Sequence, residues 1–90
     1  MLFRSNQTAN FLVYPNPASD FMNIYLETIT NENGHFRLIN LDGKEVLNFD
    51  TRSSHTTYML DIGTLSNGYY VLHYTSQTGH TKSEKVMVMR

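Results

Sequence analysis

Short apolar runs separated by polar turn residues make up most of the chain. In the run Phe21–Leu26, the strongly apolar residues Met22, Ile24 and Leu26 alternate with wetter neighbours. A period of two is typical of a β-strand that buries only one face. No stretch of useful length has the period of an amphipathic helix. The pattern therefore predicts a chain built from short β-strands.

About seven such runs follow one another at a spacing of roughly 8–12 residues, with turn residues between them. Their aromatic and β-branched content favours strands. This pattern predicts an all-β fold, an antiparallel β-sandwich of about seven strands, with a small closed barrel as the alternative. The predicted strands are Phe11–Tyr14, Phe21–Leu26, His35–Asn40, Glu45–Phe49, Thr56–Leu60, Tyr69–Tyr74 and Lys82–Met89.

Proline, glycine and asparagine mark the turns between these strands. In the tripeptide Pro15, Asn16 and Pro17, neither proline has an N–H to donate, so we expect a stiff corner after the first strand. The Asp-Gly pair that ends at Gly43 predicts a tight turn. The Asn-Gly pair that ends at Gly34 predicts a hairpin, because Asn-Gly is the strongest short hairpin signal.

The segment Leu65–Arg90 contains the last predicted hairpin. Just before it, Ile62 and Leu65 lie three residues apart, which suits one short helical turn that closes an end of the core. Gly68 can take a positive φ where the hairpin begins. The second strand of the hairpin runs to the end of the sequence, where a chain frays unless the sheet holds it. We therefore expect this terminal strand to matter for function.

Alternation divides the last hairpin into two faces. The set assigned to the core is Tyr70, Leu72, Tyr74, Val86 and Val88. The opposite set is Tyr69, Val71, Met87 and Met89, with His73 and Lys85 among them. Because a sandwich strand needs only one buried face, the second set predicts an apolar strip on the surface. The alternative is that loops, or Leu2 and Phe3 near the start, cover it.

Composition limits the function classes. Ninety residues make one small domain, which we place at residues 11–90, with residues 1–10 as a linker or an expression-derived segment. A net charge of -1 without a basic stripe argues against a nucleic-acid partner. The absence of cysteine removes disulfides, thiolate metal sites and cysteine nucleophiles.

The side chains that could bind a metal ion or catalyse a reaction are scattered along the chain. None of the four histidines, His35, His55, His73 and His80, has another histidine two or four positions away, so we interpret them as solvated side chains rather than zinc ligands. No Gly-x-Ser-x-Gly nucleophile elbow is present, and the turn aspartates lack the spacing of a calcium loop. We expect no catalytic residue, no metal and no cofactor, and therefore no enzyme.

Several short motifs nevertheless occur in a distinctive order along residues 11–90. They are Val13-Tyr14-Pro15-Asn16-Pro17-Ala18, Phe21-x-Ile, Leu41-Asp42-Gly43-Lys44-Glu45-Val46, Leu60-Asp61-Ile62-x-x-Leu65-x-x-Gly68-x-Tyr70-x-Leu72, and Lys85-Val86 with Arg90. In this combination the chain resembles the C-terminal sorting domain carried by cargo of the type IX secretion system (Por secretion system) of Bacteroidetes.

The resemblance implies an immunoglobulin-like seven-stranded sandwich at the end of a larger exported protein. A signal peptide would take that precursor across the inner membrane. The translocon's cargo receptor would then read the folded domain in the periplasm, and a surface sortase would cut it off, within residues 1–12. The cargo domain ahead of it would reach the cell surface or the extracellular space. The sorting domain itself would catalyse nothing.

We expect the terminal strand and its neighbour to carry recognition, with methionine giving an adaptable surface and an uncovered edge accepting a strand. The predicted recognition residues are Tyr69, Val71, Lys85, Val86, Met87, Val88, Met89 and Arg90. The residues predicted to be structural are Pro15, Asn16, Pro17, Gly43, Gly68 and Tyr70. The same open edge predicts a weak homodimer through the terminal strand.

Two rival functions remain at this point. One is a carbohydrate-binding or adhesive sandwich module of a cell-surface protein, although the chain has no tryptophan to stack on a sugar ring. The other is a structural spacer of the fibronectin type. Their strand patterns would be alike, because turns and alternation are common to all small sandwiches.

Overall fold

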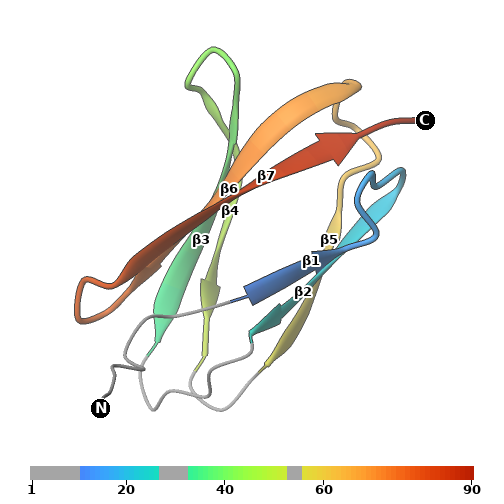
Figure 1. Cartoon of the computed structure of the whole chain (residues 1–90). Helices are drawn as coiled ribbons and strands as arrows, with labels where there is room; N and C mark the ends of the chain where they lie inside the picture. Colours follow the sequence, from blue (N-terminus) through green and yellow to red (C-terminus); the bar gives the residue numbers. More distant parts are fainter. Residues whose placement is uncertain (1–10, 27–32, 53–55) are drawn as a thin grey trace, which may run out of the picture.

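The computed structural model describes residues 11–26, 33–52 and 56–90. Every regular element within them is a β-strand (Figure 1). The strands are β1 Phe11–Tyr14, β2 Phe21–Leu26, β3 Gly34–Asn40, β4 Glu45–Thr51, β5 Thr57–Asp61, β6 Gly68–Ser76 and β7 Thr81–Val88. The linker predicted for residues 1–10, with Leu2 and Phe3, and also His55, lie outside the described residues.

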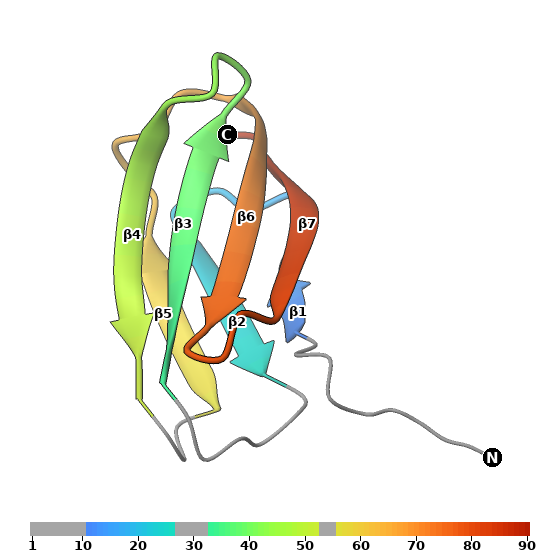
Figure 2. The ribbon, with the colours of Figure 1, turned by 90° about the vertical axis from the view of Figure 1, so that its left-hand side faces the viewer.

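Two separate antiparallel sheets face each other. One contains β1, β2 and β5 in the order β1-β2-β5, and the other has the order β4-β3-β6-β7. Figure 2 shows the four-stranded sheet in front of the three-stranded one. Because neither sheet closes on itself, the fold is an immunoglobulin-like sandwich, as predicted, and not the alternative barrel.

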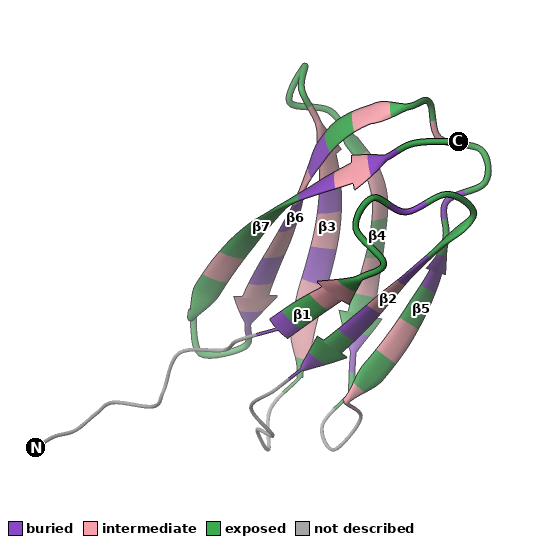
Figure 3. Cartoon of the chain, turned by 45° about the vertical axis from the view of Figure 1, so that its right-hand side comes forward, coloured by how far each residue is buried: buried purple, intermediate pink, exposed green. Residues whose placement is uncertain are grey.

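The core lies between the sheets, and buried residues alternate with more exposed ones along β2, β3 and β6 (Figure 3). Phe36 of β3 is at its centre, with its ring 5.2 Å from that of Phe11 in an edge contact. It also stacks on Phe49 at 5.2 Å and packs 4.8 Å from Tyr74. Phe11 belongs to the other sheet, so this aromatic cluster joins the two layers. The buried apolar residues are Phe11, Ala18, Met22, Ile24, Leu26, Phe36, Leu38, Leu60, Ile62, Tyr70, Leu72, Tyr74, Val86 and Val88.

The two strands of the last hairpin differ slightly from the predicted bounds. β6 continues to Ser76, since Thr75 pairs with Thr81 and Ser76 pairs with Gly34 of β3. β7 ends at Val88, and Met89 leaves the ladder to bond with another segment. The division of this hairpin into a buried and an outer face is confirmed.

The hairpin predicted at Asn33 and Gly34 is wrong. β2 and β3 belong to different sheets, so the chain crosses between layers here; Asn31 and Glu32 of this connection lie outside the described residues. Gly34 begins β3, and a Cβ built on it would lie 2.3 Å from the hydroxyl oxygen of Tyr74. Glycine is required by this close approach rather than by a turn conformation.

The two other predicted turns are present. Gly43 has a φ of +83°, and its N–H donates to the carbonyl oxygen of Asn40 at 3.0 Å, which confirms the tight turn between β3 and β4. The single turn predicted over Ile62 and Leu65 is also present, although it is too short to count as a helix. The N–H of Leu65 donates to the carbonyl oxygen of Ile62 at 3.0 Å in a single reverse turn. Ile62 is fully buried, so the turn does close an end of the core.

Replacement of Gly34 by alanine tests the close approach. We expect Gly34→Ala to lower the free energy of unfolding by about 1–3 kcal/mol, because the new methyl group forces the Tyr74 ring out of its packed position. Urea denaturation measures the change. Gly63→Ala is the control, because its Cβ meets only a carboxylate oxygen of Asp61 at 3.2 Å. Equal stability of the two variants would contradict the account.

Candidate recognition surface at the terminal strand

β7 is an edge strand, and the loop between β1 and β2 lies beside its last residues (Figure 3). The N–H of Ala18 donates to the carbonyl oxygen of Met87 at 2.8 Å, and the N–H of Met89 donates to the carbonyl oxygen of Ala18 at 2.8 Å. Ala18 and Val88 thereby form an isolated parallel bridge. This bridge links the loop of one sheet to the edge of the other.

Asn16 extends the same contact with its side chain. Its Oδ1 accepts a hydrogen bond from the N–H of Met87 at 3.0 Å, and its Nδ2 lies 3.5 Å from the carbonyl oxygen of Lys85. Pro15 and Pro17, each preceded by a cis peptide bond, flank it. Prolines have no N–H to donate to a strand, so the amide between them supplies the polar contact. The Pro-Asn-Pro corner therefore caps the edge of β7 at its end.

Arg90 fixes the chain just beyond β7. Its Nη1 donates to the carbonyl oxygen of Leu65 at 2.6 Å, and its Nη2 donates to that of Ile62. Its Nε lies 3.7 Å from a carboxylate oxygen of Asp20, and its backbone N–H donates to Oδ1 of Asn67 at 3.2 Å. The planar fork of one guanidinium thus binds two carbonyl oxygens of the same turn, a geometry that lysine cannot reproduce.

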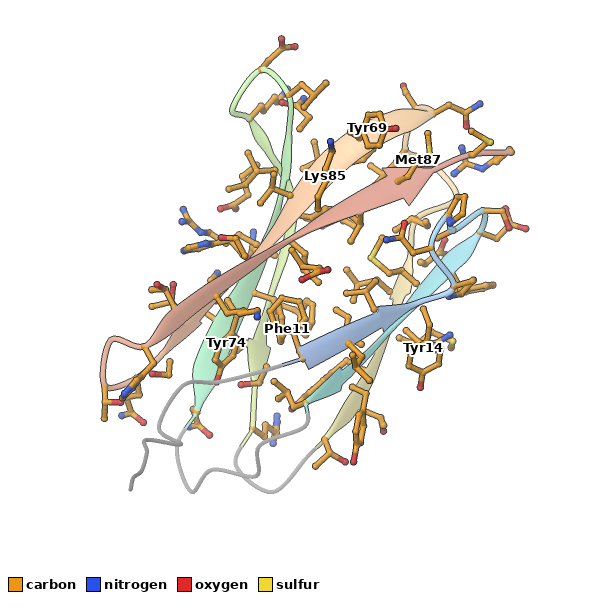
Figure 4. The ribbon with its side chains drawn as sticks, in the orientation of Figure 1. Phe11, Tyr14, Tyr69, Tyr74, Lys85 and Met87 are labelled. Carbon is orange, nitrogen blue, oxygen red and sulfur yellow. The ribbon has the colours of Figure 1, made fainter. Side chains whose placement is uncertain are left out.

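Tyr69, Lys85 and Met87 gather on the outer face of this hairpin (Figure 4). Together with Met89, which follows two positions after Met87, we call them the terminal patch. Tyr69 is opposite Met87 in the ladder, and Nζ of Lys85 lies 4.4 Å from the centre of the Tyr69 ring. That distance allows a cation–π interaction. Met89 is 52% exposed. The patch therefore offers a partner an aromatic ring, a cation and flexible thioethers.

The other predicted recognition residues lie elsewhere. Val86 and Val88 are buried in the core and support the terminal patch from behind. Val71, opposite Lys85, is half-buried beside the patch. Tyr70, which was predicted to be structural and not a recognition residue, is buried, with its hydroxyl donating to the carbonyl oxygen of Ser66 at 2.7 Å. Only part of the predicted set is therefore on the surface of the folded domain.

The outer face of the three-stranded sheet is a second apolar surface, which the sequence analysis did not single out. Register places Leu12 opposite Tyr25, and Asn23 between Tyr14 and Met59. The alternation within β2 could have revealed this surface, because the face of β2 that points away from the core still carries aromatic rings. The exposed large apolar residues of this face are Leu12, Tyr14, Phe21, Tyr25 and Met59.

Hydrophobic side chains also line a groove of about 310 Å³ between the edges of β4 and β5, formed by residues such as Leu47, Phe49 and Tyr58.

In the described part of the chain, no three histidine or acidic residues lie close enough to share a metal ion. Nδ1 of His35 contacts Asp50 at 2.6 Å, and that of His73 contacts Ser83 at 2.7 Å. Nor does any described helix have the length and apolarity to cross a membrane.

Comparison with known proteins gives three findings. A family model described as "Secretion system C-terminal sorting domain" matches residues 12–89. No curated protein matches the chain. The crystal structure of dimeric latent PorU from Porphyromonas gingivalis is similar, with a TM-score of 0.68 and 18% sequence identity over 90% of this chain. This chain spans 9% of that PorU chain, and at this identity the likeness shows the fold alone.

The contacts of Arg90 lead to a stability prediction. We expect Arg90→Ala to lower the free energy of unfolding by about 1–3 kcal/mol, because hydrogen bonds from a charged group to two carbonyl oxygens are lost. Arg90→Lys should restore only part of that loss. Urea denaturation measures both variants. Arg52→Ala is the matched control, because Arg52 bonds to Tyr58 through its backbone. A loss at Arg52 as large as that at Arg90 would refute the assigned role.

Proposed function

The chain belongs to the family of type IX secretion system C-terminal sorting domains, and we propose that it directs its cargo by presenting the terminal patch to the cargo receptor of the translocon. The observation that carries the proposal is the family match, which runs from β1 to the residue after β7. Cargo of this system has its own domain ahead of the sorting domain and is exported across the outer membrane to the cell surface or the extracellular space.

The proposal also includes two steps of the export pathway. The folded domain is read in the periplasm, and a surface sortase then cuts it from the cargo. We place the cut ahead of Phe11, because Phe11 is buried and begins β1. A protease needs an exposed and locally extended chain, so cleavage within β1 would require the sheet to open first. Residues 1–10 then serve as the linker, and residues 11–90 as the domain.

The sorting-domain family is not a family of enzymes. We propose that this domain is itself a substrate and catalyses no reaction.

Side chains rather than an added strand are the proposed means of docking at the terminal patch. Asn16 and Ala18 already bond to the backbone of Met87 and Met89 on the outer edge of β7. A partner strand would have to displace them in order to pair there. The exposed rings and thioethers need no such rearrangement, and methionine adapts to the shape of a partner.

A carbohydrate-binding function has one supporting observation, the exposed rings of Tyr14, Phe21 and Tyr25 on the outer face of the three-stranded sheet. The family match does not favour it. The face that carries these rings is instead a suitable place for control substitutions, because it lies on the opposite layer from the terminal patch.

Charging the terminal patch tests the proposal. A reporter cargo is joined ahead of residues 1–90, so that the linker is kept, in a host with a type IX system, and reporter in the medium and in cell fractions is measured. We expect Met87→Glu with Met89→Glu to leave most of the reporter in the periplasm, because the carboxylates must be desolvated when the receptor docks.

Met59→Glu is the matched control, because Met59 is 67% exposed on the opposite layer, and it should be exported normally. Circular dichroism of each purified domain confirms that the variants fold. Deletion of Val86–Arg90 is less informative, since it also removes two buried core valines. Export of the doubly charged variant at the level of Met59→Glu would refute the proposal.

A further inference from the structure

The outer edge of β7 has two unlike parts. Near its end, the N–H and C=O of Met87 point away from β6 and bond to Asn16 and Ala18. Backbone groups alternate in direction along a strand, so those of Ser83 and Thr81 also point away from β6. β7 is the last strand of its sheet, and no hydrogen bond from another described backbone group reaches these two residues on that side. The open part of the edge is therefore Thr81–Glu84 together with the N–H of Lys85, because Nδ2 of Asn16 already lies 3.5 Å from the carbonyl oxygen of Lys85.

Charges alternate in sign around the middle of this open edge. Lys82 and Glu84 flank Ser83, and their side chains share one face of β7. When two copies pair antiparallel about Ser83, Lys82 of each copy lies directly opposite Glu84 of the other. Directly opposed Cβ atoms are about 4.5–5.5 Å apart, close enough for both ion pairs. The segment is thus complementary to itself in this register.

We propose that Thr81–Lys85 is a self-association site, through which two copies of this domain join their four-stranded sheets into one continuous sheet. The two Ser83 residues exchange a pair of backbone hydrogen bonds at the two-fold axis, and Thr81 of each copy pairs with Lys85 of the other. Asn16 competes for the carbonyl oxygen of Lys85, and Asn16 and Ala18 occupy the backbone groups of Met87 and Met89, so the pairing ends at Lys85. The contact is therefore short and the dimer is weak.

The charges of Lys82 and Glu84 favour this register, and they favour a second copy of this chain over an unrelated strand. A shift of the two-fold axis to residue 82 places the two Lys82 side chains opposite each other, and a shift to residue 84 does the same for Glu84. Both arrangements are repulsive. Charged side chains, lysine above all, commonly protect an edge against association, but here the opposite signs of Lys82 and Glu84 attract a second copy in this register. A strand from an unrelated protein has no reason to present the matching pattern, whereas a second copy always does.

Paired charge reversals test the site with the full chain. Dimerisation is measured by sedimentation equilibrium over a wide range of concentrations. Lys82→Glu alone places two carboxylates opposite each other at both contacts, and Glu84→Lys alone places two ammonium groups there. Each variant should therefore dimerise about tenfold more weakly than the unaltered chain. An equimolar mixture of the two variants restores both ion pairs and should form mixed dimers at the original strength. Added salt should weaken the unaltered dimer.

Backbone pairing is tested separately by Ser83→Pro. Proline removes an N–H that points outward, which an edge strand tolerates, so the domain should fold and stay monomeric. A chain that is monomeric at its solubility limit, or single charge variants that dimerise as well as the unaltered chain, would overturn the proposal. A mixture no more dimeric than its components would overturn it too. Because the readout is mass and not export, the outcome is independent of the proposed secretion function.

Discussion

The contact between the Pro-Asn-Pro corner and the end of β7 is the constraint on which the rest of this surface depends. The two sheets share no strand. On this side of the sandwich, Ala18 connects them through the parallel bridge to Val88, and Asn16 adds its side chain. Ala18 is itself buried, so the bridge also seals the edge of the core. A strand that would otherwise end in solvent is thereby held in a defined place.

β7 serves the core and the surface at once. Val86 and Val88 pack inside, whereas Lys85, Met87 and Met89 are turned toward solvent or the capping loop. Because successive side chains of a strand point to opposite faces, any partner that docks on the outer side chains also depends on the packing of the inner ones. A defect in the core would therefore disturb recognition indirectly.

The two parts of the β7 edge have different consequences. Where Asn16 and Ala18 cover it, the backbone is satisfied and a partner meets side chains. Along Thr81–Glu84 the backbone remains open, and the charges of Lys82 and Glu84 decide what can pair with it. The proposed recognition surface and the proposed self-association site therefore lie on different parts of β7 and share only Lys85.

Local chemistry explains what could be predicted without coordinates. The period of two within each run predicted all seven strands and the inner and outer faces of the last hairpin, because burial of one face is a property of neighbouring residues. The turn at Gly43 followed from the conformational freedom of glycine. The family resemblance followed from the order of short motifs, and the family match confirms it.

Long-range contacts decided the rest. The sequence contained Asn16, but its bond to Met87 spans 71 positions; Arg90 reaches Ile62 across 28. The Asn-Gly pair at Gly34 looked like a hairpin because its turn propensity is local, yet the packed ring of Tyr74 is what requires glycine there. Periodicity specifies which side of a strand is apolar. Only the assembly of the two sheets determines which edge is capped, which is open, and which apolar side chains remain in solvent.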